Sequence, residues 1–278
     1  MPDSDPKQLV HKPEFPRSNA YDVDWVLANQ MGPNALWLVE WLTSSMKIEK
    51  GMRVLDLGCG KAMTSIFLAK EFGARVWAAD LWIGPDNNHK RACDMGVGDL
   101  VCPLRAEAHA LPFAHGFFDA IASVDSYQYF GTDQLYLGYV STFLREGGQI
   151  GVVVPGLMKP VDGEPPAHLT SPQSNGKTFW ESECWCFKTA DDWRTNWERS
   201  GKVNVDVVDT LTDGWKLWRD FERATEAAGT SPFPSDAEAI EKDAGEYLGF
   251  VRAVATRNDA EATDLYSPTI GVDVGVDT

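Results

Sequence analysis

The sequence predicts an α/β fold, a mostly parallel sheet with helices on both faces. Short apolar runs of strand length alternate with helical patterns through most of the 278 residues, as expected for such folds. The clearest unit spans residues 53–82. An apolar run over 54–57 ends in Gly58-Cys59-Gly60, a helical pattern follows, and a second apolar run over 76–79 ends on Asp80. This arrangement predicts a βαβ unit in which a glycine turn joins the first strand to a helix N-terminus.

Composition narrows the class of protein. A hydrophobic content of 44% supports a sizeable core, and no apolar run approaches the roughly 20 residues of a membrane span. The N-terminus shows no signal peptide, so a soluble, cytoplasmic protein is expected. The formal charge of -16 disfavours nucleic acid and anionic membranes as partners. The five cysteines form neither a disulfide framework nor a zinc pattern, and no metal site is expected.

The N-terminal region reads as a loose segment followed by a helical cap. Residues 1–18 are polar and hold four prolines, so they are expected to be mobile or loosely attached. Residues 21–46 carry apolar side chains at helical spacing. Gly32-Pro33 interrupts this pattern, with Pro33 suited to begin the second helix.

The remaining elements of the sheet follow the central unit in order. A helix is predicted over 86–95, a short strand over 101–104 and a fully apolar fourth strand over 117–124. A helix over 132–144 and a glycine turn over 145–148 lead to strand five over 149–154. A helix over 190–200, a strand over 203–209 and a final strand over 247–257 complete the sheet.

Two insertions and a tail are predicted in the C-terminal half. Residues 155–188 hold five prolines and an aromatic cluster, and a loop of this length is usually functional or disordered, so a lid is expected. Residues 213–243 contain two further helical patterns and form a helical insert. Residues 258–278 carry few large apolar side chains and are expected to be a disordered tail.

The glycine turn distinguishes between nucleotide ligands. A dinucleotide fingerprint requires a third glycine, whereas Gly60 is followed by Lys61, Ala62 and Met63. The stretch Asp56-Leu57-Gly58-Cys59-Gly60-Lys61-Ala62 instead resembles the first motif of class I S-adenosylmethionine (SAM) dependent methyltransferases, with Ala62 in place of the family's last glycine. The resemblance implies a Rossmann-like fold of seven strands over residues 19–257, with an N-terminal helical cap and a lid after strand five.

The same resemblance implies a set of cofactor-binding residues. Asp56 would suit the cationic amino-acid part of SAM, and Asp80 would accept hydrogen bonds from the ribose hydroxyls. Glu107, in a stretch resembling the family's acidic loop, would accept from the adenine amino group. Gly32 would meet the SAM carboxylate. The full predicted set is Gly32, Asp56, Gly58, Cys59, Gly60, Asp80, Leu81, Ala106, Glu107, Ala108 and Val124.

The sequence predicts fewer residues for the methyl acceptor than for the cofactor. Tyr127 and Gln128 follow strand four, and ligands of open α/β sheets bind beyond the carboxyl ends of the strands. Tyr127 is the candidate catalytic residue, with packing as its alternative role. Trp180 and Trp185 of the lid would wall the acceptor pocket or, alternatively, anchor the lid. Methyl transfer needs chiefly positioning, so no obligatory acid or base is assigned.

These observations lead to one expected function and two alternatives. The resemblance implies a SAM-dependent methyltransferase acting on a small molecule, with the acceptor and the oligomeric state open. A catalytically silent SAM-binding module that regulates a partner is the first alternative. An NAD-dependent oxidoreductase is the second.

Overall fold

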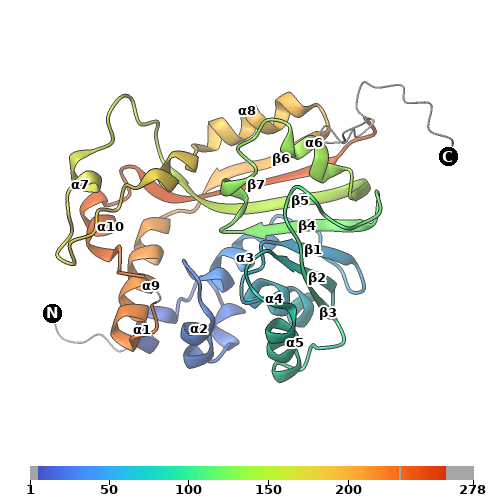
Figure 1. Ribbon diagram of the computed structural model, residues 1–278, viewed down its shortest axis with the longest axis horizontal. Coiled ribbons are helices and arrows are strands. Elements are labelled where there is room, and N and C mark those ends of the chain that lie inside the picture. The colour runs from blue at the N-terminus through green and yellow to red at the C-terminus, as the bar shows by residue number, and fades with distance from the viewer. Residues whose placement is uncertain (1–5, 232, 261–278) are drawn as a thin grey trace.

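A seven-stranded sheet in the order β3-β2-β1-β4-β5-β7-β6 forms the centre of the computed structural model, which describes residues 6–231 and 233–260 (Figure 1). The first five strands are parallel, and β7 runs antiparallel to both β5 and β6. This arrangement confirms the predicted α/β architecture. The strands are β1 (Arg53–Leu57), β2 (Arg75–Asp80), β3 (Val101–Arg105), β4 (Phe118–Val124), β5 (Leu144–Leu157), β6 (Val203–Thr210) and β7 (Leu248–Arg257).

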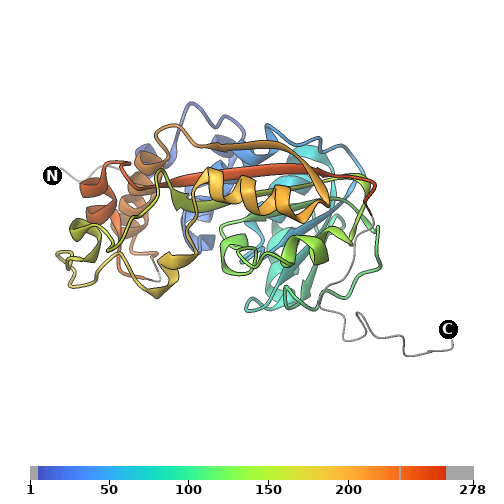
Figure 2. The same cartoon turned by 90° about the horizontal axis from the view of Figure 1, so that it is seen from above.

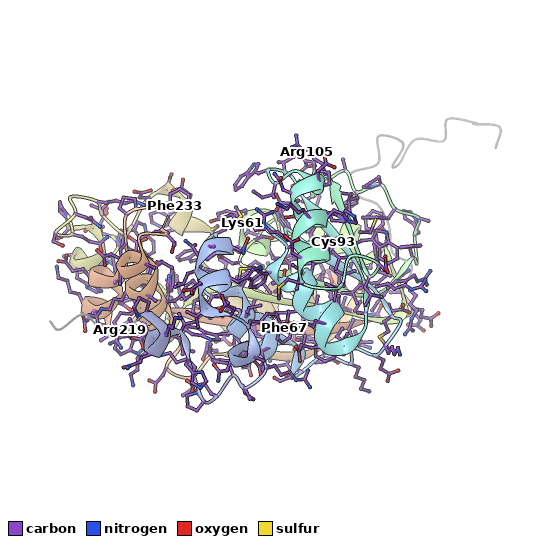
Figure 3. The ribbon with its side chains drawn as sticks, turned by 90° about the horizontal axis from the view of Figure 1, so that it is seen from below. Lys61, Phe67, Cys93, Arg105, Arg219 and Phe233 are labelled. Carbon is purple, nitrogen blue, oxygen red and sulfur yellow. The ribbon has the colours of Figure 1, made fainter. Side chains whose placement is uncertain are left out.

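Helices cover both faces of this sheet (Figures 1 and 2). One face of the sheet carries α3, α4, α5 and α9, and the other face carries α6 and α8. In Figure 3, the labelled residues Phe67, Cys93 and Arg219 belong to α4, α5 and α9. The helices are α1 (Pro6–Val10), α2 (Val23–Asn29), α3 (Ala35–Thr43), α4 (Met63–Phe72), α5 (Pro85–Asp94), α6 (Tyr136–Ser141), α7 (Ala167–Thr170), α8 (Ala190–Ser200), α9 (Gly214–Ala228) and α10 (Ala237–Asp243). Short 3-10 helices are η1 (Ser18–Ala20), η2 (Tyr127–Tyr129) and η3 (Ser182–Cys186). Within the described residues, no helix is long and apolar enough to cross a bilayer.

The central strands bury both of their faces. Successive side chains of β1 alternate between the two helical layers, so Val54 belongs to one apolar core and Leu55 to the other, each fully buried. This two-sided burial explains why the strands read as continuous apolar runs rather than alternating ones. It also fixes the carboxyl ends of β1, β2 and β4 side by side.

Strand β5 is longer than the predicted 149–154. It begins at Leu144, so the predicted turn over 145–148 is an irregularity within the strand, and it continues through Pro155 to Leu157. The Val153 carbonyl accepts the Asp125 N–H and therefore points toward β4. The nitrogen of Pro155 points to the same side of the strand. Proline is tolerated there because β4 has already ended, so the missing N–H breaks no hydrogen bond between strands. The β5–β7 pair therefore projects beyond β4. The helix predicted over 132–144 is shorter, and Asn34 rather than Pro33 caps α3.

The N-terminal segment differs from the loosely attached chain predicted over residues 1–18. In its described part, α1 lies against α9, and Val10 and Phe15 are buried. Phe15 stacks on Trp37 of α3, and the Lys12 Nζ donates to Asp220 of α9 at 2.6 Å. Apolar and charged contacts thus tie this segment to two helices. The predicted tail lies mostly outside the described residues, from position 261 onward.

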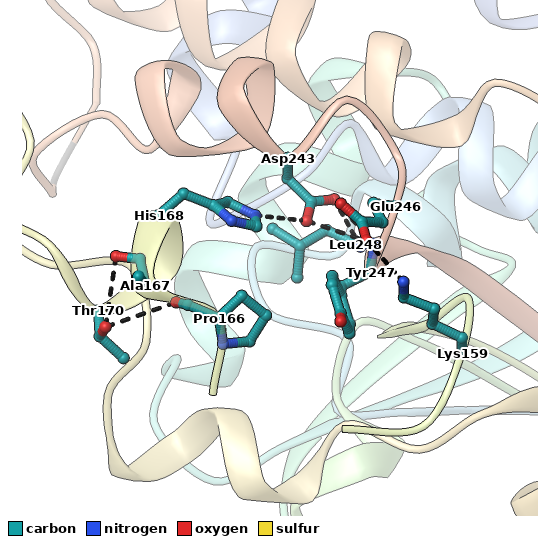
Figure 4. A network of polar contacts seen from close by, with 9 residues as sticks. All are labelled: Lys159, Pro166, Ala167, His168, Thr170, Asp243, Glu246, Tyr247 and Leu248. Carbon is teal, nitrogen blue, oxygen red and sulfur yellow. Dashed lines mark hydrogen bonds and ion pairs between the residues drawn. The ribbon is translucent and has the colours of Figure 1, made fainter. Parts of the chain in front are cut away.

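The predicted lid and helical insert form a lobe at the end of the projecting β5–β7 pair (Figure 1). Residues 155–157, assigned to the lid from the sequence, are strand instead, and α7 and η3 interrupt the rest. His168 of α7 bonds to Asp243 of α10 at 2.9 Å, and Asp243 also accepts the N–H groups of Tyr247 and Leu248 (Figure 4). The segment is therefore anchored to α10 by side-chain hydrogen bonds.

Candidate cofactor and acceptor site

The glycine turn after β1 is shaped by positive φ angles. Gly58 (φ 75°), Gly60 (φ 52°) and Ala62 (φ 62°) all adopt the left-handed region, which glycine enters readily and alanine does not. The Gly58 and Cys59 N–H groups donate to the Ala79 carbonyl at 2.8 and 3.1 Å. A Cβ on Gly58 would lie 1.9 Å from the Ser126 Oγ. The positive φ angles thus explain why positions 58 and 60 hold glycine. Ala62 adopts the same left-handed region at the cost of backbone strain.

Asp56 lies buried behind this turn. Its Oδ2 accepts hydrogen bonds from the hydroxyls of Thr64 and Ser65, in the first turn of α4. Its Oδ1 is buried, and no hydrogen-bond partner for it is present among the described residues. Burial raises the pKa of Asp56 to about 6, against the opposing effect of the two hydroxyls, and the Asp80 charge adds to the increase. The carboxylate thus braces α4 through one oxygen, and the other oxygen has no partner among the described residues.

Asp80 ends β2 beside the same turn, as predicted. Its Oδ2 accepts the Gly60 N–H at 2.9 Å, and its Oδ1 accepts the N–H groups of Trp82 and Ile83 at 2.8 Å. These bonds fix the carboxylate between two turns and leave a further lone pair on Oδ2. The neighbouring Leu81 and Trp82 are 50% and 75% exposed, an unusual degree for such large apolar groups. They line the outer edge of this position.

The predicted adenine loop follows β3. The Ala106 N–H donates to the Asp80 carbonyl at 3.1 Å, which attaches the loop to the end of β2. One carboxylate oxygen of Glu107 accepts a hydrogen bond from the backbone N–H of His109 at 2.8 Å, and the other lies 2.9 Å from the His109 Nδ1. His109 in turn faces the ring of Tyr136. Glu107 is thus oriented by His109, and the contact of Ala106 and Ala108 with an adenine ring stays a prediction.

The loop between α2 and α3 closes the site from the other side. A Cβ on Gly32 would lie 2.4 Å from the Asp125 Oδ2, and one on Gly60 would lie 3.0 Å from the Met31 Sδ. Lys61 Nζ donates to the carbonyls of Ala28 and Gln30, which fastens this loop to the glycine turn. Gly32 therefore sits where only a residue without a side chain fits.

Cys59 and Val124 occupy buried positions around the turn. The Cys59 Sγ lies 3.7 Å from the Asn88 Nδ2, and burial raises the pKa of its thiol. A buried neutral thiol serves packing rather than chemistry. Val124, 6% exposed, ends β4 at the same edge of the sheet.

Tyr127 does not lie where the acceptor prediction placed it. The residue is fully buried, and its ring packs against Phe130, Tyr136, Trp193 and Trp197 in the core beneath α6 and α8. The packing role, its alternative, fits this position, because the helices shield the ring from the carboxyl edge of the sheet. Gln128 is also fully buried but turns its Nε2 to the Asp125 Oδ1 at 3.2 Å.

Asp125 is the site residue that sequence reasoning missed. It follows β4 directly and has a positive φ of 52°. Burial raises its pKa to about 7, partly opposed by the Gln128 hydrogen bond, and the Glu222 charge on α9 adds to the increase. The sequence could have predicted Asp125 as a site residue, because an acid lies at the carboxyl end of a buried strand in both cases: Asp80 at the end of β2 and Asp125 directly after β4.

Trp180 and Trp185 form an edge-to-face pair with ring centroids 5.6 Å apart. Trp185 is 58% exposed, and η3, which carries it, packs beside η2. The Trp180 backbone N–H donates to the Leu169 carbonyl, so this residue also anchors the segment to α7. This bond lies within the predicted lid, so lining of the acceptor pocket and anchoring of the lid to the sheet both stay predictions.

A separate surface hollow of about 800 Å³ lies between β3 and α5. It contains none of the predicted cofactor or acceptor residues. Its lining includes Asp86, His89 and Cys102, at the sheet edge. The chemistry-bearing residues gather instead at the carboxyl ends of β1, β2 and β4. Among the described residues, no group of three or more metal-ligating side chains occurs.

A family model described as a methyltransferase domain matches residues 54–148, which contain the glycine turn, both acids and the Glu107 loop. The chain carries a class I SAM-dependent methyltransferase domain. SAM is the cofactor of this domain, and the residues present fit it, because Asp56 offers a buried oxygen that has no hydrogen-bond partner among the described residues.

Curated relatives share parts of this methyltransferase domain. The chain is 28% identical over 116 residues to the methyltransferase GfsG of Streptomyces halstedii, covering 41% of this chain and 42% of that protein. It is 38% identical over 79 residues to a demethylmenaquinone methyltransferase of Mycobacterium marinum, covering 28% and 30%. The match thus spans less than half the length of each of these relatives.

Solved structures establish the fold more widely. A geranyl diphosphate methyltransferase in complex with SAM superposes with a TM-score of 0.61 at 20% identity, covering 79% of this chain and 84% of that chain. A Haemonchus contortus phosphoethanolamine N-methyltransferase gives 0.62 at 15% identity, covering 92% and 60%. The methyltransferase fold therefore extends over most of this chain.

Proposed function

We propose that this protein transfers the methyl group of SAM to a small-molecule acceptor. The observation that carries the proposal is the convergence of Asp56, the glycine turn, Asp80 and Glu107 at one edge of the sheet. A dinucleotide site would need a third glycine to seat a pyrophosphate, and Met63 stands in its place.

Each part of SAM has a proposed partner in this chain. The buried Asp56 Oδ1 would accept from the amino group, and the Gly32 backbone would meet the carboxylate. Asp80, beside Leu81, would accept from the ribose hydroxyls. Glu107 would accept from the adenine amino group, with Ala106 and Ala108 against the ring. The backbone of residues 58–60 and Val124 would line the remaining path.

SAM supplies an activated methyl group on a sulfonium, so the protein's task is to orient the acceptor and to exclude water. The lobe of residues 158–188 and 213–243 is suited to this task. We propose that it closes over the acceptor as one body, because Gln173 and Ser174 hydrogen bond to Asp236 and Glu238 across its two halves. Trp185 would then face the acceptor.

Calorimetry with SAM, S-adenosylhomocysteine (SAH) and NAD tests the cofactor side. SAM and SAH are expected to bind, and NAD is not. Binding of NAD with no response to SAM would refute the proposal in favour of an oxidoreductase.

Transfer of isotope-labelled methyl groups from SAM to metabolite extracts tests the reaction. Label in a small molecule is expected. Label in no small molecule, with a stable protein partner recovered instead, would favour a silent regulatory module.

A further inference from the structure

Three polar side chains gather beyond β4, outside the groups assigned to SAM. Asp125 directly follows β4, Gln128 lies in η2, and Glu222 lies in α9. The Gln128 Nε2 donates to the Asp125 Oδ1 at 3.2 Å, and the Asp125 Oδ2 lies against the backbone of Gly32. Glu222 is close enough that its charge acts on Asp125. The cluster thus joins the sheet, the α2–α3 loop and α9.

Gln128 gives an independent sign that a ligand belongs here. Its side chain is fully buried, yet its Oε1 has no hydrogen-bond partner within the described part of the chain. Leaving a buried carbonyl oxygen without a donor carries the full desolvation penalty of that group. A ligand that brings N–H donors next to Asp125 would satisfy it.

The charged groups around this cluster are mostly acidic, with Lys188 acting on Cys186 and Lys177 acting on Asp236. Glu183 and Cys186 of η3 and Tyr129 of η2 face it, and Asp236 lies next to Glu222. Burial raises the pKa of both Asp125 and Glu222 to about 7, and none of the groups acting most strongly on either is a Lys or Arg. Nearby cations are engaged elsewhere: Lys61 holds α2, and Arg219 and Arg223 pair with Asp220 and Glu241.

Large apolar side chains surround the polar cluster at its mouth. Tyr129 of η2 is 57% exposed, and Trp185 of the neighbouring η3 is 58% exposed. Aromatic faces stabilise both apolar groups and cations. The surroundings therefore suit a ligand with a cationic head and an apolar body.

We infer that the acceptor is a primary or secondary amine on an apolar body, held by Asp125, Gln128 and Glu222, with Asp125 as the group that removes its proton. This inference rests on the proposed function and names its substrate class. The amine enters as an ammonium ion, whose N–H groups reach the Asp125 carboxylate and the Gln128 Oε1.

The proposed step balances in protons and charge. Asp125 takes one proton from the ammonium, which frees the nitrogen lone pair. The nitrogen attacks the methyl carbon, a C–N bond forms, and the carbon–sulfur bond breaks with its electron pair going to sulfur. The product is the methylated ammonium and SAH, and the proton on Asp125 passes to solvent. A catalytic base works best with a pKa near the working pH, which agrees with Asp125.

Calorimetry on the SAH-loaded protein tests this inference, with 2-phenylethylamine against 2-phenylethanol and hexylamine against 1-hexanol at pH 8. Each amine is expected to bind at least tenfold more tightly than its matched alcohol. Asp125→Asn should remove most of that preference, since asparagine tolerates the left-handed backbone as aspartate does. Glu222→Gln should reduce it, and Glu198→Gln, an exposed acid of α8 on the other face of the sheet, should leave it unchanged.

Two results would overturn the inference. One is an equal affinity for amines and alcohols in the natural protein. The other is an Asp125→Asn variant that keeps the amine preference or that loses more than tenfold in SAH affinity, because Asp125 would then serve the cofactor. Absence of SAH binding to the natural protein would instead refute the proposed function itself.

Discussion

The pH dependence of cofactor binding tests the role of Asp56. Its pKa is raised to about 6 by burial, and its free Oδ1 is assigned to the amino group of SAM. Only the ionised carboxylate attracts that group. With a pKa of about 6, the ionised fraction is about one tenth at pH 5 and about nine tenths at pH 7. SAH affinity should therefore rise about tenfold over this interval, or about 1.4 kcal/mol.

The stability of the ligand-free protein should change in the opposite sense. Because the folded-state pKa lies above the unfolded value of 3.8, the folded state binds more protons between the two values. Stability is thus lost as pH rises from about 4 to about 6, by up to about 3 kcal/mol for a shift of about two units. Asp56→Asn should remove this loss, since the amide oxygen can still accept from Thr64 and Ser65.

The assay is calorimetric titration with SAH at half-unit steps from pH 5 to pH 7, together with urea unfolding at the same values. Asp56→Asn should bind SAH weakly and without the slope. Asp125→Asn is the matched control, because it removes a different buried acid and should keep the slope near pH 6. A flat affinity in the natural protein, or an equal slope in Asp56→Asn, would refute the assignment of Asp56 to the amino group.

Three further predictions concern the turns around the cofactor. Asp80→Ala should weaken SAM binding by about 1–3 kcal/mol through lost bonds to ribose, and calorimetry showing unchanged affinity would contradict that role. Gly32→Ala should lower SAH affinity at least tenfold, because its Cβ would lie 2.4 Å from the Asp125 Oδ2; Gly84→Ala, whose Cβ meets no atom closer than 4.0 Å, should bind normally. Ala62→Gly should raise the free energy of unfolding by about 1 kcal/mol, since it relieves a φ of 62°, and a lower urea midpoint would count against strain there.

Patterns local in the sequence were enough to predict the central sheet. Two-sided burial forces β1 and β4 to read as apolar runs, and Gly58 and Gly60 mark the turn after β1, where the chain takes positive φ. The positions of Asp56 and Asp80 follow from the same unit, because carboxyl ends of neighbouring parallel strands meet at one edge.

Contacts between distant segments were not predictable in this way. The burial of Val10 and Phe15 depends on α9 and α3, which lie far along the chain, and prolines alone suggested a loose segment. Pro155 looked like the start of a loop, yet it sits in a strand because β4 has already ended beside it.

The sequence by itself determined the fold class and the cofactor motifs, because both depend on spacing within about thirty residues, the length of one βαβ unit. Only the tertiary structure decided the acceptor side. Tyr127 and Asp125 are two positions apart, but the chain turns between them. The Tyr127 ring therefore enters the core under α8, whereas the Asp125 side chain faces Gly32 and α9. Which of two neighbours meets a ligand depends on elements that pack against them, and those lie some hundred residues away in the chain.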